Sequence, residues 1–203
     1  RLYVLEKLKL DDAMAIYKNR FSDFSDFTFL FVGAFTIENI TPLVETYLGS
    51  LPALEKKEVV KNLNIAAPDT MTFVKLYNGK DDKATLQMHF EKKGELTFRD
   101  AYFSWLLGEL LNMVLVDRVR EEQSKSYASS VYSELKKIPE PIFKMDITVP
   151  CAPDQIDAVA NIVIKALNDI KNGNFNTDYI TKLKETQRTN KERELQSNNS
   201  LLG

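Results

Sequence analysis

The chain has 203 residues, of which 44% are hydrophobic and 28% are charged, and these proportions are typical of a folded globular protein. Its 27 basic and 29 acidic side chains leave a formal net charge of −2, which does not favour nucleic acid or an anionic membrane surface as a partner. No apolar run in the sequence reaches the roughly 18–20 residues that a membrane-spanning helix needs.

The first third of the chain predicts two helices with one strand between them. Residues 8–20 place apolar side chains at helical spacing. Residues 27–32 form a nearly continuous apolar run, which predicts a buried central strand. Residues 36–48 predict a second helix, with Thr36 in the position of an N-cap. Residues 50–69 contain prolines and a run of charged residues, a pattern typical of a solvated linker.

Two alternating segments then predict a hairpin. Residues 71–77 alternate between two faces, and residues 84–90 do the same, with apolar side chains on the face opposite His89. The Asn78–Gly79 pair between them is a strong turn signal. We therefore expect these two segments to pair as antiparallel strands.

The longest predicted helix follows Thr97, which begins a capping-box pattern that Asp100 completes. Apolar residues recur along this helix at steps of three and four, so it should bury a wide face in the core and lead to Arg120. These apolar residues are Leu106, Leu107, Leu110, Leu111, Val114 and Leu115.

The last part of the chain predicts a second strand pair and two helices. Residues 127–135 and 143–149 alternate as antiparallel partners. Pro153 stands at the start of a helix with a buried apolar stripe, and Gly173 ends it. Residues 177–196 predict a final helix that is mostly polar.

The order of these elements predicts an α+β fold, in which a mixed or antiparallel sheet is covered by helices on one face. The length is compatible with one hydrophobic core, because a chain of this size can bury roughly 70% of its unfolded surface. We expect residues 1–203 to form a single domain.

Arg120 and Tyr127 are the candidate binding residues. The run Asp117-Arg-Val-Arg-Glu-Glu-Gln-Ser-Lys-Ser-Tyr127 closes the long helix and opens the next strand, so a guanidinium and a phenol stand at the two sides of one turn. Both can donate hydrogen bonds to a carbonyl, and neither is a natural metal ligand or general base in this setting. We interpret the pair as a clamp on a peptide backbone. The alternative is that Arg120 caps helix carbonyls while Tyr127 packs on the sheet edge.

One histidine, His89, and one cysteine, Cys151, limit the catalytic chemistry of the chain. Zinc sites need three or four ligands drawn from His, Cys and carboxylates, and helical zinc-peptidase motifs need two histidines. We therefore expect no metal site, no cofactor and no catalytic residue in this chain. His89 is expected on the polar face of a strand, and Cys151 is expected to be a small, half-buried and unreactive residue.

Two stretches resemble a known family. Val119-Arg-Glu-Glu-Gln, followed by Ser-Tyr127, is similar to the arginine and tyrosine in the last domain of the pitrilysin (insulinase) family of zinc peptidases, especially its long bacterial members. Asp23-Phe-Ser-Asp-Phe-Thr-Phe-Leu-Phe-Val-Gly33, followed by Pro42-Leu-Val-Glu-Thr-Tyr-Leu-Gly-Ser-Leu-Pro52, resembles the strand, helix and Leu-Pro ending that open the same domain. One departure is that Gln123-Ser-Lys-Ser126 stands where the family usually has a glycine.

The resemblance implies an αββαββ-type domain that holds no metal. It implies a C-terminal piece excised from a longer peptidase, an interpretation that also fits a first residue of Arg1 and the absence of a signal peptide. The N-terminal half of the parent, which would hold zinc, and a peptide substrate are the implied partners. Arg120 and Tyr127 are the implied substrate-binding residues, and the periplasm or cell envelope is the implied location.

Two functions from different classes are compatible with these features. The first is a non-metal domain of a zinc endopeptidase, inactive alone, that closes the chamber and binds the substrate backbone. The second is a non-catalytic scaffold or partner subunit of the same family, which the missing glycine favours. A sheet-based RNA-binding function is disfavoured, because the aromatic residues of segment 27–31 lack interleaved basic residues.

Overall fold

The computed structural model describes residues 5–55, 59–65, 67–95, 97–123 and 129–202. The chain divides into two compact units, one formed by Val60–Asn190 and the other by Arg1–Val59 together with Lys191–Gly203. The expectation that residues 1–203 form a single domain stays a prediction.

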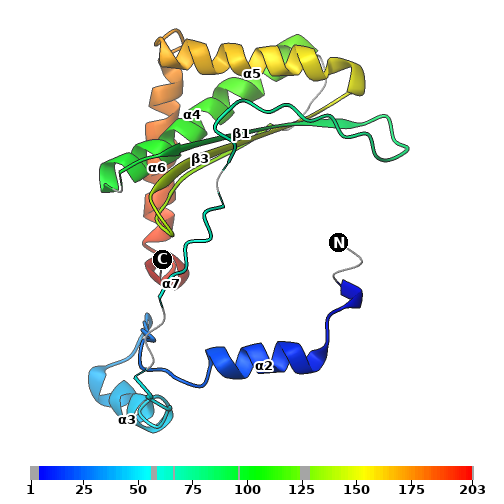
Figure 1. Ribbon diagram of the computed structural model, residues 1–203. Coiled ribbons are helices and arrows are strands. Elements are labelled where there is room, and N and C mark those ends of the chain that lie inside the picture. Colours follow the sequence, from blue (N-terminus) through cyan, green and yellow to red (C-terminus); the bar gives the residue numbers. More distant parts are fainter. Residues whose placement is uncertain (1–4, 56–58, 66, 96, 124–128, 203) are drawn as a thin grey trace. The chain divides into compact units, whose positions relative to one another are not determined.

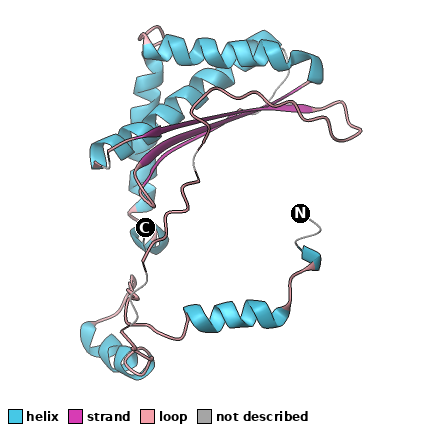
Figure 2. Ribbon diagram, in the orientation of Figure 1, coloured by secondary structure: helices cyan, strands magenta, loops and turns pink. Residues whose placement is uncertain are grey.

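The larger unit is an antiparallel sheet with helices on one face (Figures 1 and 2). Strands β1 (Ala84–Lys93) and β2 (Ser130–Lys136) both pair with β3 (Ile142–Cys151), so β1 and β2 are the edges of the described sheet. Helices α4 (Phe98–Gln123) and α5 (Ile156–Lys171) pack against the same face of the sheet. The predicted α+β fold, with helices covering an antiparallel sheet, is confirmed.

Local sequence signals account for the helix boundaries in this unit. Helix α4 begins after Thr97, whose Oγ1 accepts a hydrogen bond from the Asp100 N–H at 3.0 Å, as the capping box predicts. A 3₁₀ turn, η1 (Pro153–Gln155), leads into α5. Helix α6 (Asp178–Glu194) is mostly polar and buries Leu183, while α7 (Asn198–Leu202) is one short turn.

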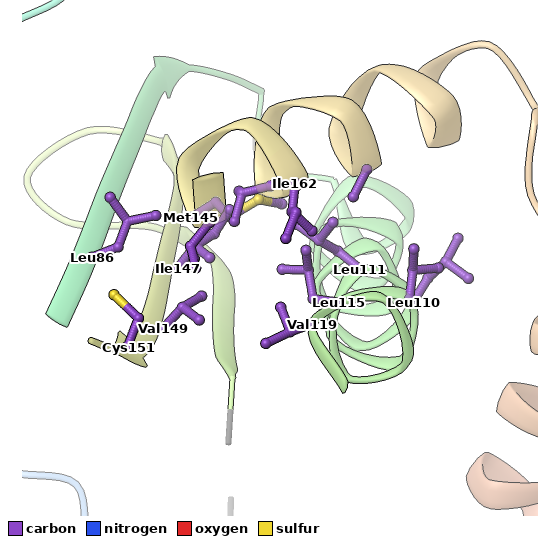
Figure 3. Packing of buried hydrophobic residues seen from close by; sticks show 14 of the residues in the cluster. Leu86, Leu110, Leu111, Leu115, Val119, Met145, Ile147, Val149, Cys151 and Ile162 are labelled. Carbon is purple, nitrogen blue, oxygen red and sulfur yellow. The ribbon is translucent and has the colours of Figure 1, made fainter. Parts of the chain in front are cut away.

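The hydrophobic core lies between the sheet and helices α4 and α5 (Figure 3). Leu86 of β1 and Ile147 of β3 point towards the helices, where they belong to one cluster with Leu111 and Leu115 of α4. Each aliphatic side chain buried in this way contributes about 1.5–3 kcal/mol. Cys151 ends β3 inside the core as a free thiol, and burial raises the pKa of that thiol, so it is more buried than the sequence predicts and poorly suited to act as a nucleophile.

The smaller unit contains α2 (Leu10–Arg20) and α3 (Ile37–Tyr47). Thr36 caps α3 as predicted, because its Oγ1 accepts a hydrogen bond from the Asn39 N–H at 3.3 Å. The buried carboxylate of Asp23 accepts a hydrogen bond from the Leu54 N–H at 2.8 Å. This contact joins the turn after α2 to the chain that follows α3.

Two predicted strands do not form in the described part of the chain. Residues 27–32 and residues 71–77 have no paired strand, and β1 pairs with β3 rather than in the expected hairpin with residues 71–77. Their apolar side chains stay exposed, for example Leu30 at 64% and Leu76 at 87%. An alternating pattern shows which side chains share a face, but a strand also needs a neighbour for its backbone hydrogen bonds.

Helix α4 crosses edge strand β2 at Gly108. A Cβ atom at this position would lie 2.7 Å from Cβ of Ser133, so only glycine allows the helix to approach this closely. One turn earlier, Ser133 Oγ donates a hydrogen bond to the Ser104 carbonyl at 2.8 Å. These two contacts determine where α4 crosses β2, and they therefore determine where the C-terminal end of α4 lies.

We predict that Gly108→Ala destabilises the protein. Intrinsic helix propensity alone would favour alanine by about 1 kcal/mol, but the new methyl group would overlap Ser133, and overpacking of this kind typically destabilises by about 1–3 kcal/mol. Urea unfolding of the single variants and of Gly108→Ala/Ser133→Gly measures the effect. The double variant should lose less stability than the sum of the two single variants. A Gly108→Ala midpoint at or above that of the parent would show that the crossing is not tight.

Candidate functional site

Arg120 is an exposed residue in the last turn of α4. It lies twelve residues after the crossing at Gly108, which places it about 18 Å further along the helix axis at the rise of an α-helix. Strand β2 begins at Ser130, three residues before the crossing residue Ser133. Because the chain reverses direction between α4 and β2, Arg120 and the start of β2 lie at the same end of the layer.

The charged neighbours of Arg120 bind other elements. Asp117 accepts a hydrogen bond from the Tyr179 hydroxyl of α6 at 2.8 Å, and Arg118 Nη1 lies 2.8 Å from Asp169 Oδ2 of α5. Burial, together with the Asp117 carboxylate, raises the pKa of Tyr179 to about 12. These pairs anchor the end of α4 to α5 and α6.

The guanidinium of Arg120 makes no hydrogen bond or ion pair with any other residue that the structure describes. It therefore does not cap a described carbonyl of α4, which was the alternative interpretation of this residue. Its predicted partner Tyr127 lies outside the described residues.

A charged cluster of His89, Glu91, Lys144 and Asp146 lies on the face of the sheet opposite the core. The β1–β3 register places His89 opposite Asp146 and Glu91 opposite Lys144. His89 Nδ1 lies 2.6 Å from Asp146 Oδ1, and its Nε2 lies 3.0 Å from Glu91 Oε1. The Lys144 ammonium also pairs with Glu91, which in turn accepts a hydrogen bond from the Ala67 N–H at 3.3 Å.

The carboxylates of this cluster favour the charged form of its histidine. The hydrogen bond to Asp146 raises the pKa of His89 above its ordinary value of 6.5, with Glu91 adding to the effect and partial burial opposing it. Hydrogen bonds from Lys144 and then His89 lower the pKa of Glu91 to about 2. The charges are mutually paired, so the cluster is suited to joining β1 and β3 rather than to proton transfer.

Alternation in the sequence predicts the polar face for His89, and the structure confirms that placement. The sequence did not identify the cluster around it, because the partners Lys144 and Asp146 come from β3 and depend on the strand register. Among the described residues, no group of three or more His, Cys, Asp or Glu side chains could hold a metal ion. No helix in that same part of the chain is long and apolar enough to cross a membrane.

Comparison with known proteins identifies relatives of this fold. A family model described as the Peptidase M16 inactive domain matches residues 7–187, whereas no curated protein matches the chain. The structure is similar to the periplasmic protease PqqL from Escherichia coli, with a TM-score of 0.71 and 16% identity over 94% of this chain and 21% of that chain. It is also similar to a mutant of the ferredoxin protease FusC in complex with Arabidopsis ferredoxin, with a TM-score of 0.68 and 15% identity over 96% of this chain and 21% of that chain.

At these identities the similarity to the two proteases shows the fold alone. The chain spans about a fifth of the length of either solved chain, since it covers 21% of each.

We predict that the charged cluster makes stability depend on pH. The folded pKa of His89 exceeds its unfolded value, so its contribution to stability is complete below the unfolded pKa and is lost as the pH rises through the folded pKa. The difference in urea midpoint between the parent and His89→Gln should therefore shrink between about pH 5.5 and pH 8.

The single histidine allows the same group to be titrated directly by NMR. The imidazole pKa should lie above 6.5 in the parent and should fall in the control variant Asp146→Asn, which removes the principal carboxylate. A His89 pKa that is unchanged by Asp146→Asn would contradict this account of the cluster.

Proposed function

Because the chain belongs to the M16 peptidase family through its inactive domain, we propose that it is the metal-free C-terminal domain of a zinc endopeptidase. In this proposal the domain pairs with an N-terminal half that holds zinc, closes the proteolytic chamber and binds the backbone of the peptide substrate. The family membership itself confirms the resemblance drawn from the sequence.

The observation that carries the proposal is the state of Arg120. Its guanidinium is exposed and has no partner among the described residues, while Asp117 and Arg118 beside it are paired with other helices. A guanidinium offers five N–H donors in a planar fork, which suits the carbonyl oxygens of a peptide backbone. Arg120 is therefore available to hold a substrate segment at the end of α4.

Tyr127 is the second residue of the proposed clamp. Its phenol would donate a hydrogen bond near the scissile bond or to the oxyanion that forms there. A donor placed where negative charge develops contributes about 2.7–4 kcal/mol to the stability of a transition state. Neither Tyr127 nor Arg120 would take part in bond breaking, which would take place at the zinc site of the other half.

The proposal predicts that Tyr127→Phe and Arg120→Lys impair the intact peptidase. Tyr127→Phe removes one donor and little volume, so kcat/KM should fall about ten- to a thousand-fold with little change in melting temperature. Arg120→Lys should also lower kcat/KM, because a point charge does not reproduce the planar fork. Steady-state kinetics on a peptide substrate and thermal melts of each variant measure both effects.

Matched controls come from the paired residues nearby. Tyr179→Phe and Arg118→Lys make the same chemical changes at residues bound to Asp117 and Asp169, so they should lower the melting temperature and leave kcat/KM nearly unchanged. If Tyr127→Phe and Arg120→Lys behave like these controls, the pair is structural, and the alternative of a non-catalytic scaffold takes the place of the clamp.

A second experiment tests the division of labour between the halves. The isolated chain should bind no stoichiometric zinc and cleave no peptide, because its single histidine and single cysteine cannot supply a peptidase zinc site. Addition of the separately produced N-terminal half should produce cleavage that a chelator abolishes. Chelator-sensitive cleavage by the chain alone would contradict the proposal.

A further inference from the structure

We infer that the free edge of β2 is a docking site for an extended peptide, which joins the sheet as an additional strand beside Arg120. The inference rests on the proposed function and deepens it, because it names the way in which the substrate main chain is held.

The outer edge of β2 is open in the described sheet. β2 pairs on one side with β3 in an unbroken register from Ser130 opposite Thr148 to Lys136 opposite Ile142, and no described strand pairs with its other side. Such an edge presents a row of backbone N–H and C=O groups that a further strand can use. Proteins usually protect edges with prolines or bulges, and β2 has neither along its seven residues.

The two elements that border this edge contain unsatisfied polar atoms. Asn112 Oδ1 on α4 and Ser129 Oγ just before β2 are buried and have no hydrogen-bond partner among the described residues. Asn112 lies one helical turn after Gly108, the residue at which α4 meets β2. A buried polar atom without a partner costs about 1–3 kcal/mol. An added main chain would offer N–H donors to the Asn112 oxygen and carbonyl acceptors to the Ser129 hydroxyl.

The opposite edge of the sheet lacks this combination. On β1, Glu91 accepts a hydrogen bond from the Ala67 N–H, so the chain's own backbone already approaches that strand. Only the β2 edge lies at the same end of the layer as Arg120, whose donors would bind a carbonyl of the incoming segment. An extended peptide supplies carbonyls and N–H groups in alternation, which favours it as the occupant over a folded surface.

The test uses the 203-residue chain and a blocked seven-residue peptide of alternating threonine and valine, which matches the length of β2. The control peptide has the same side chains and is N-methylated at every second residue, so it cannot donate along one edge. Hydrogen exchange is measured at saturating peptide. Alternate amides of residues 130–136 should exchange at least about tenfold more slowly, whereas β1 should not change.

A pair of proline variants tests the same edge from the side of the protein. Adjacent residues in a strand direct their N–H groups to opposite edges, so one of Val131→Pro and Tyr132→Pro removes an outward donor and the other removes a donor to β3. The outward variant should retain its melting temperature and lose peptide protection. Because both positions are measured, a variant that unfolds still leaves the other as the test.

Several results would overturn the inference. These are equal protection by the N-methylated peptide, protection of β1 in place of β2, and a peptide-independent dimer in which β2 is protected by a second copy. The proposed function would fail separately, through unchanged kcat/KM in Arg120→Lys and Tyr127→Phe. Lowered turnover in those variants, with no peptide protection of β2, would leave the clamp in place and remove the edge site.

Discussion

The close crossing of α4 over β2 is the constraint on which the rest of the larger unit depends. Gly108 allows the helix to approach Ser133 so closely that a Cβ atom would meet it at 2.7 Å, and the Ser133 hydroxyl bonds the same helix one turn earlier. With the crossing in place, the apolar stripe of α4 lies over the sheet and encloses the core with α5. The twelve residues beyond Gly108 then carry Arg120 to the end where β2 begins.

Polar pairs at the C-terminal end of α4 complete this arrangement. Asp117 bonds Tyr179 of α6, and Arg118 pairs with Asp169 of α5, so the last turns of α4 are held by both neighbouring helices. The same pairs remove Asp117 as a competitor for Arg120. A guanidinium that is held on a fixed helix and has no described partner is prepared for a ligand, because little ordering is required when the ligand binds.

Much of this fold follows from sequence patterns that act locally. The Thr97 cap, the stripe of α4 and the alternation of β1, β2 and β3 all depend on residues a few positions apart, and each is observed. The strands expected at residues 27–32 and 71–77 are not, because pairing depends on a distant partner that no local pattern identifies. For the same reason the sequence places Arg120 at a helix end but does not show that Asp117 and Arg118 are paired elsewhere.

The distribution of satisfied hydrogen bonds separates structural polar groups from available ones. His89 is the only histidine and would be the first residue suspected of catalysis, yet both of its ring nitrogens contact carboxylates that are themselves part of the cluster. The border between α4 and β2 differs, because Asn112 and Ser129 each keep a buried oxygen without a described partner and Arg120 keeps its donors. Since an unsatisfied buried group lowers stability unless something binds it, this border is where the structure favours a ligand, and the histidine cluster is where it favours rigidity.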